Sequence, residues 1–531
     1  MRSIGARTAF LGGAAVLACA VAAGAAAQTR GPASPSARSG GTLTIALDAD
    51  PDVLDPTLAR TFVGRMVFAH MCEKLYDLNS KVQIVPQLAA ALPKFSADKQ
   101  TVTIRLRRGI RFNDGTPFNA AAVKKSLERH KTLPRSTRAS ELAPVTSIAT
   151  SGNYTVVLRL DSRYSPITAQ LADRAGMIMS PKQIDALGDR FGTNPVCVGP
   201  FSFKERVAAD HITLTKSQNY YAKNKVRLAQ IVFRIITDPS ARTQNLRAGS
   251  VQVEEGLQAT DIPSVKRDKS LRIIKSTSIG YQGITINIGN KNGLGKQYQN
   301  VGTSIARSAS LRRAFSLALD RKLINKLVFG GTVAPDCFPF APASPWFAAT
   351  KGLPCYRTAQ VKAAQRLVNA SGAQKPIDVK MMIGTDPVAA RFGAVVQSLV
   401  AKVGFKVTLA PTEFVTALGR QDAGNYETFA VGWSGRVDAD GNVYQFYHSK
   451  GSQNVSGYVD PLVDLTLTNA RKAASLKARI TNYHAFLKRA LRDLPIIYLY
   501  HPVNRNAATN KVRGVQVFGD GLVRAYFGYY R

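Results

Sequence analysis

The segment from Ile377 to Leu409, IDVKMMIGTDPVAARFGAVVQSLVAKVGFKVTL, decides the fold class of this chain. Ile377 to Ile383 has the apolar pattern of a strand. Asp386, followed by Pro, caps a helix with an apolar stripe, and Gly404 ends that helix. Phe405 to Leu409 predicts a second strand. A strand, a helix and a strand with such sharp boundaries form a βαβ unit, which indicates an α/β fold.

The same alternation continues on both sides of this unit. We expect strands at 41–49 and 101–106, and helices opened by Asn119, by Thr358 with its end at Gly372, and by Asp460. Strands and helices that alternate over this length predict several α/β lobes with mixed or parallel sheets.

The chain is long and strongly basic. Its 531 residues suffice for two or more lobes with their own cores. Lys and Arg number 71 against 34 Asp and Glu, a formal charge of +37, but they occur in scattered pairs such as Arg107-Arg108 and Lys124-Lys125. Scattered pairs favour a solvated basic surface over nucleic-acid binding, which would need one contiguous basic face and a steep salt dependence.

Residues 1–27 have the pattern of a secretory signal peptide. Arg2 and Arg7 precede an apolar, small-residue stretch that ends in Ala25-Ala26-Ala27. We expect cleavage, export to the periplasmic space or the outer face of the cytoplasmic membrane, and a flexible tether over residues 28–40. The alternatives are an uncleaved membrane anchor and a bacterial lipoprotein with its lipid on Cys19.

Four cysteines follow the signal: Cys72, Cys197, Cys337 and Cys355. An even count in an exported chain predicts two disulfides, for which three pairings exist. Cys337 and Cys355 bracket a Pro-rich loop, so we pair them with each other, which leaves Cys72 with Cys197. Neither the cysteines nor the histidines have zinc-ligand spacing, so no metal site and no cofactor are predicted.

No motif in the sequence supports catalysis. It has no nucleophile elbow, no phosphate-binding loop followed by Lys-Ser/Thr and no H-E-x-x-H zinc motif, and its six histidines are scattered. We predict a protein that is not an enzyme. The competing hypothesis is a secreted hydrolase on an α/β scaffold, which would require a nucleophile and a base within about 3 Å of each other.

Five motifs in order resemble the extracellular solute-binding proteins of the peptide/nickel class, family 5, which serve ABC importers. They are IVPQLAAALPKFSADKQTVTIRLRRGIRFNDGTPFNAAAVKKSLER at 84–129, NPVCVGPFSF at 194–203, SLRRAFSLALDRKLINKLVFGG at 310–331, NVSGYVDPLVD at 454–464 and LPIIYLYH at 494–501. The third motif is expected to be a single helix. Together the motifs extend from about Gly40 to the carboxyl end.

The resemblance implies a periplasmic-binding-protein-like fold of the three-lobed, class C kind. Two α/β lobes are joined by two crossing segments, and a small third lobe is inserted early. We expect lobe I at 41–58, 198–282 and 501–531, the inserted lobe II at 59–197, and lobe III at 283–500. The crossings are placed near 281–287 and 495–502. Such lobes close over a ligand by hinge motion, and the closed form is what the permease recognises.

The resemblance also points to a ligand-binding segment, Gly432 to Gly441. In peptide-binding members an acid soon after a Gly-Trp pair holds the ligand's α-amino group, but Arg436 stands at that position here. Asp438 or Asp440 could hold the amine from a shifted register. Arg436 could instead bind a carboxylate or phosphate, point to solvent or pair with Asp438. The candidate ligand-binding residues are Tyr281, Trp433, Ser434, Gly435, Arg436 and Asp438.

The sequence thus predicts the monomeric substrate-binding subunit of an ABC importer for a di- or oligopeptide, with membrane permease subunits as partners and no nucleic acid. The alternatives within this class are an anionic or opine-like small molecule and a nickel complex.

Overall fold

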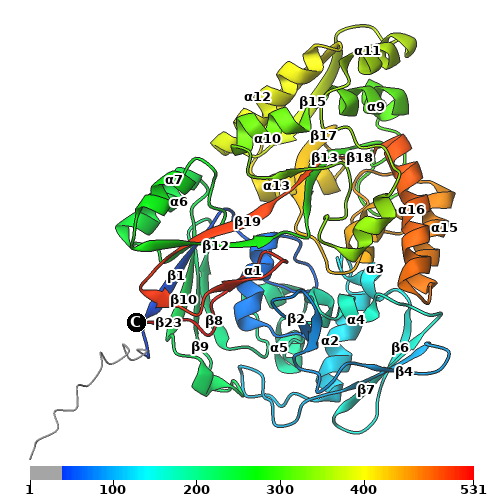
Figure 1. Ribbon diagram of the computed structural model, residues 1–531. Helices are drawn as coiled ribbons and strands as arrows, with labels where there is room; N and C mark the ends of the chain where they lie inside the picture. The colour runs from blue at the N-terminus through cyan, green and yellow to red at the C-terminus, as the bar shows by residue number, and fades with distance from the viewer. Residues whose placement is uncertain (1–38) are drawn as a thin grey trace, which may run out of the picture. The chain divides into compact units, whose positions relative to one another are not determined.

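A seven-stranded sheet draws its strands from widely separated parts of the chain (Figure 1). In spatial order these are β12 (Leu271–Thr277), β19 (Val503–Thr509), β11 (Val253–Glu254), β1 (Thr42–Leu47), β10 (Gln230–Ile235), β9 (His211–Lys216) and β8 (Phe201–Val207). The computed structural model describes residues 39–531. The expected signal peptide, the alternative lipid site at Cys19 and most of the tether therefore lie outside the described residues.

A six-stranded mixed sheet forms the second large core. Its order is β14 (Ala334–Pro335), β18 (Ile496–His501), β13 (Tyr281–Ile286), β17 (Thr428–Trp433), β15 (Ile377–Ile383) and β16 (Phe405–Pro411). The helices of this region are α8 (Ser304–Arg307), α9 (Ala309–Ala318), α10 (Arg321–Phe329), α11 (Val361–Ala370), α12 (Pro387–Ala401), α13 (Phe414–Asp422), α14 (Asp440–Tyr447), α15 (Pro461–Lys472) and α16 (Leu476–Asp493), with a 3₁₀ turn at Pro345–Thr350.

A four-stranded antiparallel sheet lies between β1 and β8 in the sequence. Its order is β4 (Lys94–Phe95), β5 (Thr101–Arg105), β7 (Thr155–Leu160) and β6 (Val145–Thr150). Its own hydrophobic cluster uses residues from Leu75 to Val198. The helices between β1 and β8 are α1 (Phe62–Met71), α2 (Ala120–Thr132), α3 (Ala139–Leu142), α4 (Ile167–Gln170) and α5 (Pro181–Leu187), with 3₁₀ turns at Arg174–Gly176 and Gly188–Thr193.

Short elements complete the description. Helices α6 (Pro239–Ala248) and α7 (Ile262–Arg267) follow β10 and β11, and a 3₁₀ turn spans Lys223–Lys225. Three two-stranded sheets pair β2 (Tyr76–Leu78) with β3 (Ile84–Pro86), β20 (Val512–Arg513) with β23 (Tyr529–Tyr530), and β21 (Gln516–Val517) with β22 (Val523–Arg524).

The βαβ unit forms as the sequence predicts. β15 and β16 pair in parallel, and the carboxylate of Asp386 accepts hydrogen bonds from the first backbone amides of α12. Asn119 and Asp460 cap α2 and α15 in the same manner. The predicted α/β class is therefore confirmed.

Two local predictions are wrong. The single helix expected at 310–331 is interrupted after Ala318, because Asp320 accepts a hydrogen bond from the amide of Leu323 and caps a second helix. The helix expected from Thr358 starts at Val361 and has no side-chain cap. The crossings expected near 281–287 and 495–502 remain a prediction, and these ranges hold β13, β18 and Pro502. The chain passes between the two large sheets at residues 278–280 and at Pro502.

Both expected disulfides are present, Cys72–Cys197 and Cys337–Cys355. Cys72 follows α1, whose side chains pack in the core of the seven-stranded sheet, and Cys197 lies just before β8 of that sheet. The first disulfide thus joins the two points at which the chain leaves and re-enters this core. The four-stranded sheet lies entirely within the loop that it closes.

Candidate ligand-binding site

A cavity of about 110 Å³ lies between the start of α1 and the strands β13 and β17. Thr61 and Phe62 line one side, and Tyr281, Trp433 and Ser434 line the other. Phe62 packs against the core of the seven-stranded sheet, whereas Tyr281 and Trp433 belong to a core on the six-stranded sheet. The cavity is therefore walled by segments from two separate cores, a common location for ligand sites.

The aromatic wall is set by strand pairing. Tyr281 and Trp433 are direct partners in the antiparallel ladder of β13 and β17, so their side chains lie on the same face of the sheet. Tyr281 packs edge-on against Tyr498 at a ring-centroid distance of 4.8 Å, and burial raises its pKa well above the usual value. The indole N–H of Trp433 donates to the carbonyl of Gly441 at 3.0 Å. The wall is thus preorganised rather than loose.

The loop after β17 turns sharply at Gly435. Its φ is +82°, and a Cβ there would lie 2.3 Å from the carbonyl oxygen of Ile279, so only glycine fits. Asn442 then clamps the loop: its side chain accepts a hydrogen bond from the amide of Arg436 at 2.7 Å and donates to the carbonyl of the same residue at 3.0 Å. These two hydrogen bonds fix the backbone position from which the Arg436 side chain extends.

Arg436 is buried and its partner is Asp173, not Asp438 and not solvent. Its guanidinium also lies over the Trp433 ring, 4.2 Å from the centroid, and its Nη1 donates to the Ser434 hydroxyl at 3.4 Å. Arg65 donates to the other carboxylate oxygen of Asp173 at 3.2 Å. Burial alone would raise the pKa of Asp173, but Arg436 and Arg65 outweigh it and hold that pKa well below its usual range. A second, very small cavity of about 10 Å³ adjoins Gly435 and Arg436.

The two acids considered for a ligand amine both have arginine partners. Asp438 receives two hydrogen bonds from Arg479 at 2.6 and 2.7 Å, and Asp440 receives two from Arg471 at 2.7 and 2.9 Å. Neither acid lines the described cavities. The structure therefore brings Tyr281, Trp433 and Ser434 to the first cavity and Gly435 and Arg436 to the second. Asp438, the remaining candidate, lines neither cavity.

Several polar contacts join the early segments to the region of the six-stranded sheet. Arg60 forms an ion pair with Asp422 at 2.5 Å. The Gln170 side chain donates to Asp440 at 2.9 Å. The hydroxyls of Ser140 and Ser452 are 2.9 Å apart. These contacts hold the two sides of the cavity together.

The sequence did not reveal the residues on the α1 side of the site. Thr61, Arg65 and Asp173 belong to no motif, and they lie more than 260 residues from Ser434 and Arg436 in the chain. The Gly-Trp pair was found only because it resembles a family pattern.

Residues 83–454 match the protein family described as bacterial extracellular solute-binding proteins, family 5 Middle. The chain belongs to this family. As a family 5 solute-binding protein it is the substrate-binding component of an ABC importer, and it is not an enzyme. Within residues 39–531, no helix combines the length and the apolar character needed to cross a membrane.

Similar proteins support this assignment along nearly the whole chain. The glutathione-binding protein GsiB of Pectobacterium atrosepticum is 24% identical over 482 residues, which cover 88% of this chain and 90% of GsiB. AgaA of A. tumefaciens R10, solved with agropinic acid, superimposes with a TM-score of 0.80 at 23% identity, covering 92% of this chain and 96% of AgaA. DppA of Helicobacter pylori, solved with the peptide STSA, superimposes with a TM-score of 0.83 at 22% identity, covering 93% of this chain and 98% of DppA.

At this level of identity the solved structures establish the fold. It is the mixed α/β periplasmic-binding-protein fold of the class C kind that the sequence predicted.

Proposed function

We propose that this family 5 solute-binding protein captures a short peptide or a similarly compact amino-acid derivative and delivers it to its permease. The observation that carries the proposal is the cavity walled by Thr61 and Phe62 on one side and by Tyr281, Trp433 and Ser434 on the other. Aromatic faces and hydroxyls suit a small solute with apolar and polar parts. The cavity volume of about 110 Å³ favours a compact solute over a long peptide.

The similar proteins support the same range of ligands. The names and complexes of the three relatives mention glutathione, agropinic acid and the peptide STSA, all of which are built from amino acids or their derivatives. A nickel complex has less support, because the residues that line the main cavity include no His, Cys, Asp or Glu. An opine-like anion is the second candidate, and the observation that favours it is Arg436 in the place of the amine-binding acid.

We also propose three lobes with the boundaries given by the sequence, except that the first boundary of lobe II moves from residue 59 toward Cys72. The reason is that α1 packs in the core of the seven-stranded sheet. Residues 278–280 and Pro502 act as the hinge in this proposal. The His501 ring N–H donates to the carbonyl of Gly280 at 2.7 Å, which keeps the two passages side by side.

The protein would act outside the cytoplasm as a monomer. Export follows from the amino-terminal pattern and agrees with the two disulfides, because such bonds persist in oxidising compartments.

Titration calorimetry of the mature protein against di- and tripeptides, glutathione and opines tests the ligand class. We expect heat and a thermal shift with at least one member, and binding at least about tenfold weaker in Trp433→Ala, since an aromatic cavity wall contributes well over 1 kcal/mol. Leu327→Ala, at an exposed position of α10, is the matched control and should bind normally. No heat and no thermal shift with any member would overturn the proposal.

A further inference from the structure

Six charged side chains form one buried cluster beside the cavity. They are Arg65, Arg138, Glu141, Asp173, Arg174 and Arg436, each at most 9% exposed. Four guanidinium groups face two carboxylates, so the cluster holds two more positive than negative charges. Buried charges are normally paired, because an unpaired charge loses its hydration without compensation. The excess therefore requires an explanation.

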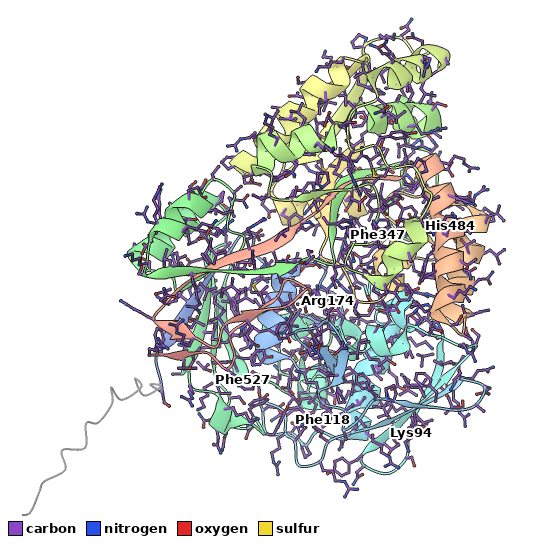
Figure 2. All side chains as sticks on the ribbon, viewed as in Figure 1. Lys94, Phe118, Arg174, Phe347, His484 and Phe527 are labelled. Atoms are coloured by element: carbon purple, nitrogen blue, oxygen red, sulfur yellow. A yellow bond between two sulfur atoms is a disulfide. The ribbon has the colours of Figure 1, made fainter. Side chains whose placement is uncertain are left out.

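Arg174 is the least satisfied member. The side chain of Arg174, labelled in Figure 2, is fully buried. Within residues 39–531 its guanidinium makes one hydrogen bond, a long one of 3.5 Å from Nη1 to the carbonyl of Thr61. Its Nε and Nη2 have no acceptor among residues 39–531, and the same holds for Nη2 of Arg436. Burial and the nearby Arg138 lower the pKa of Arg174 to about 9, in agreement with the missing acceptors.

The other arginines have fixed partners. Arg138 donates to Glu141 at 2.5 Å and to the hydroxyl of Thr137 at 2.7 Å. Arg65 and Arg436 share Asp173. The unfilled donors are thus concentrated on Arg174 and Arg436.

The cluster and the main cavity share a wall. Thr61 lines the cavity and accepts the hydrogen bond of Arg174. Ser434 lines the same cavity, and its hydroxyl accepts hydrogen bonds from Arg65 at 3.0 Å and from Arg436 at 3.4 Å. Thr61 and Ser434 therefore contact both the cavity and the guanidinium groups of the cluster.

We propose that the arginine cluster binds an oxyanion group of the transported solute, with Arg174 and Arg436 as its donors. This inference rests on the proposed function and narrows it to acidic solutes, such as a peptide or an amino-acid conjugate that carries one carboxylate more than a neutral peptide does. Guanidinium groups hold carboxylates and phosphates through paired, charge-assisted hydrogen bonds.

The placement of the donors also links the anion to closure. Arg174 lies in the segment enclosed by the Cys72–Cys197 disulfide, whereas Arg436 follows β17 of the six-stranded sheet. An anion that contacts both residues binds the closed state more tightly than an open one, and this difference in affinity drives closure.

Sulfate is a suitable probe, because it needs no knowledge of the solute. The melting temperature of the full mature protein is measured in sodium sulfate and in sodium chloride at equal ionic strength. We expect 20 mM sulfate to raise it by about 2 °C above chloride, for a millimolar site in a protein of this size. The sulfate-specific rise in melting temperature should disappear in Arg174→Gln and, separately, in Arg436→Gln, because each variant should bind sulfate at least about tenfold more weakly.

Arg313→Gln is the matched control, because Arg313 is exposed on α9. It should keep the full sulfate effect. Far-UV circular dichroism checks that each variant folds, and Arg174→Lys, which keeps the charge, should retain part of the effect if the other substitutions prove unstable. No sulfate-specific rise in the unaltered protein, or a rise that persists in both glutamine variants, would overturn the proposal.

The outcome is separable from that of the proposed function. If a neutral dipeptide binds tightly while sulfate has no specific effect, the anion site is refuted and solute capture stands. If sulfate acts through Arg174 while no peptide, conjugate or opine binds, the anion site stands and the proposed solute class is refuted.

Discussion

Removing the Cys72–Cys197 disulfide should destabilise the protein more than removing the Cys337–Cys355 disulfide. The two pairs are 125 and 18 residues apart in sequence. A cross-link stabilises mainly by reducing the entropy of the unfolded chain, so in the chain-entropy model the long loop contributes about 5 kcal/mol and the short one about 3 kcal/mol. Unfolding a chain of roughly 500 residues involves an entropy of about 1 kcal/mol per kelvin, so the melting temperature should fall by about 5 °C and about 3 °C respectively.

The assay is calorimetric melting of two double variants, Cys72→Ala/Cys197→Ala and Cys337→Ala/Cys355→Ala. The unaltered protein melted with and without a reductant is the control, because reduction removes the cross-links while it keeps the buried sulfur atoms. In the first variant the segment that holds the four-stranded sheet should also melt separately, since the bond closes the base of that segment. Equal losses in the two variants, or a larger loss in the second, would refute this reasoning.

Three further predictions concern buried charges and export. Burial raises the pKa of Glu73 to about 7 despite hydrogen bonds from two tyrosines. Between about pH 4.5 and 7 this carboxyl is therefore protonated in the native state and ionised in the unfolded chain. The free energy of unfolding consequently falls as the pH rises through this window. Glu73→Gln should therefore match the unaltered protein at pH 5 and exceed it by about 3 kcal/mol at pH 8 in urea titrations, and an equal difference at both pH values would contradict this. Arg471→Met leaves the buried Asp440 with Gln170 as its side-chain partner and should lower the free energy of unfolding by about 3–5 kcal/mol. Adding Asp440→Asn should restore part of this loss in the same urea titration. If it restores nothing, the loss does not come from the broken Arg471–Asp440 ion pair. Mass spectrometry of the exported protein should find Gln28 at its amino terminus, whereas a lipid on Cys19 would show the alternative processing.

Local structure was predictable wherever a few adjacent residues determine it. The βαβ unit could be delimited because Asp386 caps its helix and Gly404 ends it, and both effects act within one turn. The break at Asp320 was missed because the apolar pattern continues across it, and the deciding interaction is a single capping hydrogen bond.

The site was only half predictable, because it is assembled from distant segments. The Gly-Trp pair and Arg436 could be found through a family pattern. The partner of Arg436 could not, since Asp173 lies more than 260 residues away and is one acid among 34. For the same reason Asp438 was a candidate for binding a ligand amine, although Arg479, 41 residues further along, occupies its carboxylate.

Native mass spectrometry of the protein as isolated tests the central claim most directly, because a closed site retains its solute. The account predicts one small adduct that denaturation releases, with a composition of an amino-acid derivative or short peptide carrying a net negative charge, and a much smaller adduct population in Arg174→Gln. A retained solute that is neutral or cationic, or an adduct population unchanged in Arg174→Gln, would contradict it.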